Sequence, residues 1–377
     1  MTADIAFIGG RGLFSNYGGV ENAIREITLQ LAEKQILINV YGVNNEIDSI
    51  FELPQNVKRI SIYSWIYQFL GQHGLIFFAV LLAIFKHRPR LVIIFASGPC
   101  IFTPILRLGG LKVITSLRAI DSERDKWGVV SRQILRLGEY CAWKFPHQFT
   151  VNSLEMFKLF KTKRKDIVYI ANGAKAATQG NDPILKRLNV KPFQYFLFAA
   201  RLDPVKRLDK LLEAHSLLPD TMRLPLIVAG GHVKDPAYER TIQALANDRV
   251  FFTGHISQDQ LNPLMHNCRA FILPSILEGM SNSLLSAMAS KRPVIAADVP
   301  ANRDVIKAET DALFTADDIN ELSIKMFKLA ADPEYCTDLG NRLHKVTEAH
   351  YSWKKTASQF YQLAKPLIKN TNKYDNS

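Results

Sequence analysis

Residues 4–34 read DIAFIGGRGLFSNYGGVENAIREITLQLAEK, and this stretch decides the fold. Residues 4–8 form a short apolar run, which predicts a buried strand. A glycine-rich loop follows, and after it Ile24, Ile27 and Leu31 recur at helical spacing. The order strand, glycine loop, helix begins a βαβ unit, so the sequence predicts an α/β fold with a parallel sheet covered on both faces.

Similar units follow on both sides of a polar segment that contains glycine and proline. Strands are expected at residues 37–41, 90–95, 112–116, 195–199, 224–229, 250–253, 271–274 and 293–296, and a helix at 208–217. The polar segment, 174–192, is expected to be a linker. We therefore expect two doubly wound domains, residues 1–173 and 193–352, with ligands at the carboxyl ends of the strands in a cleft between them.

The composition is that of an ordinary globular protein. The chain has 377 residues, of which 47% are hydrophobic and 22% charged, and its length predicts two domains. The four cysteines contain no C-x-x-C pair and the nine histidines no H-E-x-x-H, so neither a disulfide framework nor a metal site is expected. The N-terminus, MTADIAFIGG, does not look like a signal peptide, which predicts a cytoplasmic protein.

The net charge of +12 is concentrated in the first half, where residues 1–170 contain 21 Lys and Arg against 13 Asp and Glu. This half also contains the apolar stretch 75–85 and five cations within residues 158–165. Eleven residues are fewer than the roughly 20 that span a membrane, so the stretch is expected to be a buried helix or one lying in a membrane interface. Charge and apolar stretch together indicate a peripheral surface for anionic lipid or a phosphorylated substrate. No nucleic-acid-binding motif accompanies the charge.

Two glycine pairs invite a nucleotide-binding interpretation. The first loop, Gly9-Gly10-Arg11-Gly12, lacks the G-x-G-x-x-G spacing, and the next strand ends without an acidic residue, so a dehydrogenase is not expected. Gly18 and Gly19 lie directly before the helix that starts near Glu21. Backbone N–H groups there are suited to a diphosphate, although an ordinary tight turn explains the two glycines equally well.

The second half contains a stronger pattern, AARLDPVKRLDKLLEAH at residues 199–215. Arg201 follows a predicted strand, and Lys206 precedes a predicted helix. Two cations at the carboxyl end of one strand can neutralise a diphosphate leaving group without a metal ion.

A second pattern, PSILEGMSNSLLSAMASKRPVIA, occupies residues 274–296. It places Glu278 on a loop after a strand, and residues 279–282 open a helix with Ser or Asn as its cap. A carboxylate beside the first-turn N–H groups of a helix is suited to binding sugar hydroxyls and phosphate together.

Six segments taken in order resemble the family 4 glycosyltransferases of the GT-B fold, and most of all bacterial members that build O-antigen and other surface polysaccharides. They are YGGVEN (17–22), VYIANGA (168–174), AARLDPVKRLDKLLEAH, IVAGG (227–231), FTGHI (252–256) and PSILEGMSNSLLSAMA. The similarity continues to the closing segment YSWKKTASQFYQLA (351–364). It implies two Rossmann-like domains facing a cleft and a C-terminal helix, residues 353–377, that crosses back to the N-terminal domain.

The resemblance implies metal-independent, retaining transfer from a nucleotide-diphosphate sugar, with no cofactor. Arg201 and Lys206 would bind the diphosphate, and Glu278 would hold the sugar hydroxyls. The other donor-binding residues that it implies are Gly18, Gly19, Asn172, Gly279, Met280, Ser281, Asn282, Ser283 and Leu284. For Asn172 a turn role in its Asn-Gly pair is an equally good explanation.

One departure from the family pattern concerns the nucleotide ribose. The second glutamate of the family, eight positions after the first, is replaced by Ser286. A hydroxyl is a weaker acceptor than a carboxylate, which predicts a donor affinity about ten- to a hundred-fold lower.

A second departure lies in SLRAIDSERDKWG, residues 116–128. Arg118 replaces a histidine of the family, whereas Arg124 and Lys126 match its Arg-x-Lys-Trp ending on the acceptor side. Asp121 is expected to position the acceptor hydroxyl. Asp121, Glu123 and Asp125 also fit a salt-bridged surface turn or a D-x-D metal motif.

The expected function is therefore that of a cytoplasmic glycosyltransferase, peripheral on the inner face of the cell membrane. It would move a hexosyl or deoxyhexosyl unit to a polyprenyl-diphosphate-linked saccharide in lipopolysaccharide O-antigen or capsule biosynthesis. The alternative is an inactive pseudo-enzyme that binds another transferase. Arg118 and Ser286 favour that alternative, and the intact residues Arg201, Lys206 and Glu278 oppose it.

Overall fold

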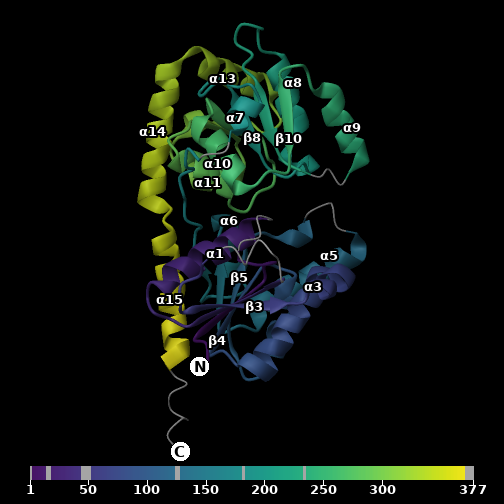
Figure 1. Ribbon diagram of the computed structural model, residues 1–377, viewed down its shortest axis with the longest axis vertical. Helices are drawn as coiled ribbons and strands as arrows, with labels where there is room; N and C mark the ends of the chain where they lie inside the picture. Colours follow the sequence, from purple (N-terminus) through teal and green to yellow (C-terminus); the bar gives the residue numbers. More distant parts are fainter. Residues whose placement is uncertain are drawn as a thin grey trace, which may run out of the picture. The chain divides into compact units, whose positions relative to one another are not determined.

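The computed structural model describes residues 2–13, 18–43, 52–123, 128–180, 183–231 and 235–369. The chain divides into two compact units, unit 1 with residues 1–172 and 353–377, and unit 2 with residues 173–352. Each unit contains one parallel β-sheet with helices around it (Figure 1). The predicted α/β fold with two doubly wound parallel sheets is confirmed.

The sheet of unit 1 has seven parallel strands in the order β3-β2-β1-β4-β5-β6-β7. They are β1 (Ile5–Ile8), β2 (Ile38–Val43), β3 (Val57–Ile62), β4 (Leu91–Phe95), β5 (Lys112–Leu117), β6 (Gln148–Val151) and β7 (Val168–Tyr169). The order reverses between β1 and β4, and Gly9 follows β1 at this point with φ 137°. A Cβ on Gly9 would lie 2.5 Å from the Phe95 carbonyl oxygen, so only glycine fits this close approach.

Helices cover both faces of the first sheet. They are α1 (Gly19–Ala32), α3 (Ser64–Leu82) continued by the π-helical turn η1 (Ala83–His87), α4 (Thr103–Leu108), α5 (Val129–Lys144), α6 (Leu154–Lys161) and α15 (Trp353–Lys369), with 3-10 turns η2 (Pro99–Phe102) and η3 (Asp121–Glu123). Side chains alternate along β1, so Ile5 and Phe7 pack in the cluster under α1 and α15, whereas Ala6 and Ile8 pack in the cluster under α3, α5 and α6.

The apolar stretch 75–85 belongs to α3 and η1. Its inner face, including Leu75, Ile76, Ala79 and Val80, is buried in the core, while Phe77 and Phe85 are exposed. The helical segment is longer than the apolar stretch because it begins at Ser64, and Gly71 interrupts it with non-helical angles. By length and composition it is the one helix in the described part of the chain that could cross a membrane, and 39% of its most apolar window is buried. A buried core helix has the same length and composition.

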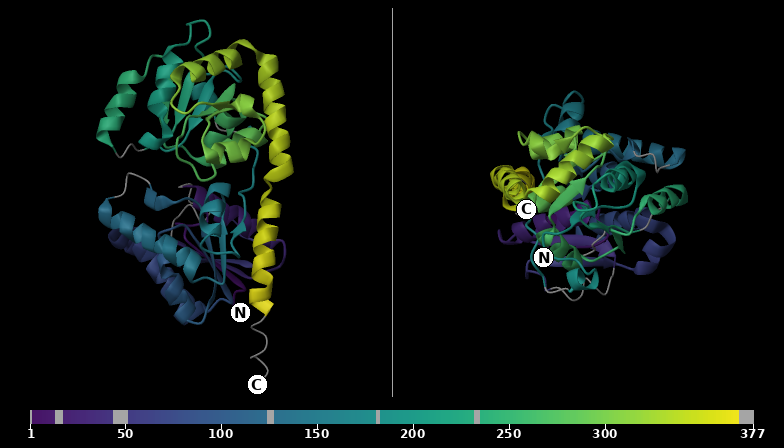
Figure 2. Two further views of the ribbon diagram at one scale, coloured as in Figure 1. Left: turned by 180° about the vertical axis from the view of Figure 1, so that it is seen from behind. Right: turned by 90° about the horizontal axis from the view of Figure 1, so that it is seen from above.

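The C-terminal helix α15 packs in unit 1 although it follows unit 2 in the sequence (Figure 2). The ring centroid of Phe360 in α15 lies 5.9 Å from the ring centroid of Phe95 at the end of β4. The Thr356 hydroxyl donates a hydrogen bond of 2.8 Å to the carbonyl of Ala171. Trp353, Ala357, Phe360 and Ala364 complete the apolar cluster beneath α1.

The sheet of unit 2 has six parallel strands in the order β10-β9-β8-β11-β12-β13. They are β8 (Phe196–Ala199), β9 (Leu226–Ala229), β10 (Val250–Gly254), β11 (Ala270–Leu273), β12 (Val294–Ala297) and β13 (Leu313–Phe314). The order reverses between β8 and β11, so the loops after these two strands form the position where ligands bind in such sheets.

The helices of unit 2 complete its two outer layers. They are α7 (Ile184–Arg187), α8 (Leu208–Ser216), α9 (Pro236–Leu245), α10 (Gln258–Asn267), α11 (Asn282–Ala289), α12 (Pro300–Ile306), α13 (Ile319–Ala331) and α14 (Pro333–His350), with 3-10 turns η4 (Pro204–Lys206) and η5 (Thr310–Ala312). Each strand expected from the sequence is present within a few residues of its predicted bounds. The short helix α7 lies within the segment that was expected to be a linker.

Candidate functional site

The loops after β8 and β11 bring together two residues that lie 72 positions apart. Lys206 Nζ is 2.6 Å from Glu278 Oε1, and the two side chains are 12% and 10% exposed. The backbone N–H of Ile276 donates to the carbonyl of Val205 at 3.0 Å, which fixes one loop against the other. A mostly buried ion pair at the switch point of a sheet is a candidate binding site rather than a surface salt bridge.

Arg201 occupies the same edge in a more open position. Its guanidinium lies 3.4 Å from Asp203 Oδ2, and 51% of its side chain is exposed. Gly230 follows the neighbouring strand β9, and a Cβ there would lie 2.1 Å from the Ala200 carbonyl oxygen. Glycine therefore allows the loop after β9 to approach the residue before Arg201.

Helix α11 begins directly after Glu278. Ser281 is its N-cap, and the Ser281 hydroxyl accepts a hydrogen bond from the N–H of Leu284 at 3.3 Å. Met280 and Leu284 are buried, whereas Gly279, Asn282 and Ser283 are partly exposed. The positive end of the α11 dipole thus lies beside the loop that carries Glu278.

Ser286 lies one turn further along α11 and is partly exposed. Its carbonyl accepts a hydrogen bond of 2.6 Å from the Ser290 hydroxyl. The Ser290 hydroxyl also accepts from the N–H of Ala177 at 2.8 Å. The helix is therefore anchored at Ser290, while the Ser286 side chain stays on the partly exposed face.

Gly18 and Gly19 lie at the start of α1 in unit 1, and Glu21 accompanies them. The Glu21 carboxylate is buried and accepts a hydrogen bond from the N–H of Arg11 at 3.2 Å. A Cβ on Gly18 would meet only Glu21 Oε2, at 3.4 Å. The Glu21 carboxylate thus lies close to Arg11 and Gly18, a contact that the sequence did not predict.

Arg118 is enclosed rather than exposed. Its guanidinium lies over the rings of Phe95 and Phe360, at 4.7 and 5.8 Å from their centroids, and donates to Asn172 Oδ1 at 2.6 Å. Burial lowers the pKa of Arg118 to about 9, so it keeps its charge at neutral pH. Its Nε and Nη2 have no hydrogen-bond partner in the described chain. Asn172, the last residue of unit 1 before unit 2 begins, is therefore held by a buried cation.

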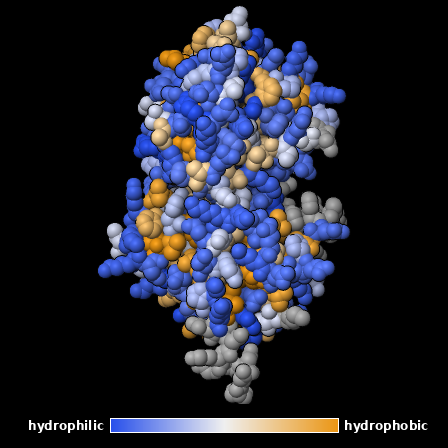
Figure 3. Space-filling model, turned by 90° about the vertical axis from the view of Figure 1, so that its left-hand side faces the viewer, coloured by the Kyte–Doolittle hydropathy of each residue, from blue (hydrophilic) through white to orange (hydrophobic). Residues whose placement is uncertain are grey.

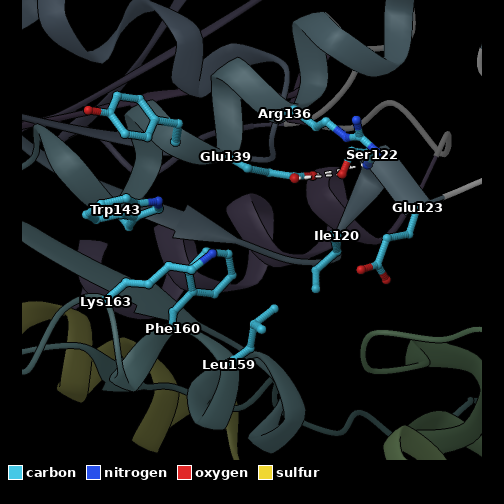
Figure 4. Close-up of a pocket in the computed structure, with 10 residues that line it drawn as sticks. Ile120, Ser122, Glu123, Arg136, Glu139, Trp143, Leu159, Phe160 and Lys163 are labelled. Atoms are coloured by element: carbon cyan, nitrogen blue, oxygen red, sulfur yellow. Dashed lines mark hydrogen bonds between the residues drawn. The ribbon is translucent and has the colours of Figure 1, made fainter. Parts of the chain in front are cut away.

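Asp121 lies in the turn η3, and Glu139 of α5 holds this turn in place. Glu139 Oε1 accepts from the N–H of Ser122 at 3.1 Å, and its Oε2 accepts from the Ser122 hydroxyl at 2.7 Å (Figure 4). Burial raises the pKa of Glu139, the bonds from Ser122 oppose that effect, and the charge of Asp121 adds to it. Arg124, Lys126 and Asp125 lie outside the described residues.

A pocket of about 380 Å³ lies between α5 and α6 beside this turn (Figure 4). The α5 residues that line it are Arg136, Glu139, Tyr140 and Trp143. These residues were missed by the sequence analysis. Their spacing of three, four and seven positions puts them on one helix face, and that pattern was the available signal.

The basic cluster at residues 158–165 is only partly available to a partner. Arg164 donates to the carbonyls of Trp143, Pro146 and His147 and forms two hydrogen bonds with Asp166. The hydrogen bonds that Arg164 donates to Asp166 lower the pKa of the Asp166 carboxyl. Arg164 therefore caps the end of α5, and Lys158, Lys161, Lys163 and Lys165 remain exposed.

Within the described ranges, no group of three or more His, Cys, Asp or Glu side chains is placed to hold a metal ion. The D-x-D interpretation of Asp121, Glu123 and Asp125 lies partly outside those ranges. Metal independence stays a prediction.

The comparisons with known proteins give a family match in the second half of the chain. Residues 183–346, somewhat less than half of the chain, match the family model described as "Glycosyl transferases group 1". The match contains Arg201, Lys206, Glu278 and Ser286. The resemblance to glycosyltransferases noted in the sequence is confirmed.

Two curated relatives from Escherichia coli are similar to parts of the chain. The serotype-specific mannosyltransferase WbdA is 29% identical over 174 residues, 44% of this chain and 21% of WbdA. The O-antigen chain mannosyltransferase B is 25% identical over 183 residues, 47% of each protein. The matched region thus spans less than half the length of either relative.

A solved structure is similar over nearly the whole chain. Anabaena HepE in complex with UDP-glucose superposes with a TM-score of 0.76 at 18% identity, covering 96% of this chain and 99% of HepE. At this identity the likeness concerns the fold. It confirms the GT-B architecture expected from the sequence.

Proposed function

We propose that this chain, whose residues 183–346 form a glycosyl transferases group 1 domain, is a retaining glycosyltransferase. It moves a hexosyl or deoxyhexosyl unit from a nucleotide-diphosphate sugar to a lipid-linked saccharide in O-antigen or capsule biosynthesis. The observation that carries this proposal is the pair Lys206–Glu278, held at 2.6 Å on the ligand-binding edge of the second sheet. The E. coli relatives, both mannosyltransferases by name, support the polysaccharide setting.

The donor diphosphate is bound by cations of unit 2. Lys206 lies against Glu278 and is mostly buried, so its charge is weakly screened by water. Arg201 is half exposed and swings toward the outer phosphate. As the bond between sugar and phosphate breaks, negative charge grows on the diphosphate, and the two fixed cations stabilise it without a metal ion.

The transferred sugar is bound by Glu278 and by the start of α11. A carboxylate accepts hydrogen bonds from two hydroxyls, and its contact with Lys206 fixes its orientation. First-turn N–H groups of α11, from Gly279 to Leu284, and the helix dipole add to the binding of anionic donor oxygens. Ser286 lies on the same helix toward the nucleotide ribose.

The acceptor is bound in unit 1. Asp121 positions the acceptor hydroxyl, and Glu139 fixes the turn that carries it. Arg118 acts through Asn172 and Phe360 rather than by touching the acceptor, because it is enclosed by both. Arg124 and Lys126 contribute positive charge on the acceptor side, and Gly18 and Gly19 face the donor phosphates.

Unit 1 is also the part that meets the inner face of the cell membrane. Its exposed aromatic and aliphatic side chains include Tyr63, Trp65, Phe69 and Leu70 of α3. Figure 3 shows the side of the molecule on which α14 and α15 lie, where hydrophobic side chains are scattered among hydrophilic ones. The exposed side chains of α3 and the exposed lysines of α6 support peripheral binding to anionic lipid.

The decisive experiment incubates the purified chain with a panel of UDP-, GDP- and dTDP-sugars and measures the release of nucleoside diphosphate. Turnover of one donor is expected, stimulated by lipid-linked saccharides extracted from cell membranes and undiminished by excess EDTA. A chain that binds nucleotide but turns over none of the donors would contradict the enzyme and support the pseudo-enzyme. Loss of activity in EDTA that manganese restores would overturn metal independence alone.

A further inference from the structure

The pocket between α5 and α6 is distinct from the donor-binding residues, because it lies wholly in unit 1. It measures about 380 Å³, and the turn η3 forms one side of it (Figure 4). A space of this size holds about one or two monosaccharide units. Aromatic and charged side chains line this space.

Aromatic rings form one wall of the pocket. Tyr140 and Trp143 meet edge to face with their centroids 5.2 Å apart, and Phe160 faces them from α6. Tyr140 is exposed, whereas Trp143 is partly buried against the core. Because the two rings are nearly perpendicular, at 82°, Trp143 holds Tyr140 edge to face, and the exposed Tyr140 ring offers an apolar face that suits the C–H face of a sugar ring.

The charged groups of the lining are balanced. Two cations, Arg136 and Lys163, and two carboxylates, Glu123 and Glu139, line the pocket, so its net charge selects neither an anion nor a cation. Among the described residues, neither the Arg136 guanidinium nor the Glu123 carboxylate has a hydrogen-bond or ion-pair partner. Donors and acceptors are therefore available side by side, and a hydroxyl group can use both because it donates and accepts.

The pocket is tied to the turn that carries Asp121. Glu139 is only 8% exposed, and both of its oxygens hold Ser122, the neighbour of Asp121. The pocket residues Ile120 and Ser122 flank Asp121 in the sequence. A group bound in the pocket is thus placed in a fixed relation to the Asp121 carboxylate.

We propose that this pocket binds a sugar unit of the acceptor saccharide other than the one that receives the new bond. The proposal rests on the proposed function, since it names where the acceptor of that reaction is held. Tyr140 stacks on the ring, Trp143 holds Tyr140 in place, and Arg136 and Glu123 bind the sugar hydroxyls. Residues that bind a sugar unit other than the reacting one act on acceptor binding rather than on the chemical step.

The test uses saturation-transfer NMR on the full chain with the methyl α-glycosides of glucose, galactose, mannose, rhamnose and N-acetylglucosamine. At least one glycoside is expected to bind. Tyr140→Ala and the double variant Glu123→Gln/Arg136→Met are expected to weaken that binding at least tenfold. Gln133→Ala, an exposed change on α5 outside the pocket, serves as the matched control and should bind normally.

The outcomes separate this proposal from the function on which it rests. Binding of UDP and GDP is measured on the same samples, and the pocket variants should leave it unchanged. Glycoside binding without nucleotide binding would contradict the transferase and keep the pocket. The pocket proposal is overturned if no glycoside binds, if the variants bind like the parent chain, or if inorganic phosphate alone occupies the site through Arg136.

Discussion

The two units of this chain differ in charge more than in fold. Unit 1 contains 26 Lys and Arg against 14 Asp and Glu, whereas unit 2 contains 21 of each. The whole surplus of +12 therefore belongs to unit 1. Net charge governs long-range attraction to anionic surfaces and not the fold, so two similar sheets can serve opposite electrostatic tasks.

The exposed hydrophobic side chains are divided in the same way. Among the described residues, unit 1 exposes fourteen large hydrophobic side chains and unit 2 exposes five. In unit 2, by contrast, the charged residues of the candidate site form ion pairs with each other, Lys206 with Glu278 and Arg201 with Asp203. These differences favour unit 1 as the part that meets the membrane and unit 2 as the part that binds the donor in the proposed function.

The largest expected effect concerns the internal pair of unit 2. Glu278→Gln removes the charge that pairs with Lys206 and that is proposed to hold the sugar, so kcat should fall about a hundred-fold or more. Binding to anionic vesicles should stay the same, since unit 1 is untouched. Steady-state kinetics, cosedimentation and thermal melting of the same preparation check this.

Glu213→Gln is the matched control for that change. Glu213 pairs with Lys210 at 3.0 Å, but both side chains are about one third exposed, so the pair contributes little. Activity should be unchanged. Equal activity in the two variants would show that the buried pair of unit 2 is structural only.

The second effect concerns the surface of unit 1. Replacing Trp65 and Phe69 by serine removes two exposed aromatic side chains of α3. Each contributes about 1.5–3 kcal/mol when fully buried, so affinity for anionic vesicles should fall at least tenfold, with no change in the melting temperature. Flotation or cosedimentation in low and high salt measures this, and high salt should weaken binding further.

Two exposed side chains of unit 2 provide the comparison. Ile324→Ser and Phe327→Ser change a surface of similar exposure on α13 and should leave vesicle binding intact. If both pairs of substitutions weaken binding equally, the difference between the units does not govern membrane attachment.

A third effect is smaller and lies within unit 2. If Ser286 faces the nucleotide ribose as proposed, Ser286→Glu supplies a carboxylate that accepts hydrogen bonds from the ribose hydroxyls. Donor KM should then fall up to about tenfold, with kcat nearly constant. Thr241→Glu, an exposed change on α9, should alter neither. An unchanged or higher donor KM for Ser286→Glu would mean that this position does not face the ribose.

The smallest effect is one of pH and stability, in unit 1. Burial and the charges of Arg107 and Lys112 lower the pKa of His147 to about 4, so the folded state resists protonation. The contribution of His147 to the free energy of unfolding is fully present at pH values above its unfolded-state pKa of about 6.5. It is lost as the pH falls toward the folded-state pKa of about 4.

His147→Asn should flatten that dependence by about 1–2 kcal/mol, because Asn accepts the hydrogen bond of the Val113 N–H but does not titrate. Urea unfolding between pH 7 and pH 4.5 tests this. An unchanged slope would assign the acid sensitivity to other groups.

The fold was predictable because its signals are local. The run 4–8 and the helical spacing of Ile24, Ile27 and Leu31 need no distant contact to be interpreted, and β1 and α1 appear where they were expected. Four strands, β3, β6, β7 and β13, were not predicted. Of these, β7 and β13 have two residues each, too few for a pattern. Their pairing depends on neighbours that only the folded sheet supplies.

The residues of the candidate site could be proposed from the sequence, but their contacts could not. Lys206 and Glu278 were selected for separate roles, yet their ion pair joins loops 72 residues apart. Arg118 was assigned to the acceptor side from its position alone, and its enclosure by Phe95 and Phe360 depends on a helix from the far end of the chain. Long-range packing of this kind has no signal in a single sequence.

The return of α15 to unit 1 determines the order in which the molecule can mature. Residues 1–172 are synthesised before unit 2, yet their apolar cluster lacks Trp353, Ala357 and Phe360 until all of unit 2 has been synthesised. Unit 2 is continuous in sequence, so its core needs no residue from outside residues 173–352. Unit 1 therefore cannot complete its core until after unit 2 has been made, and during that interval its apolar residues are the ones that a chaperone would protect.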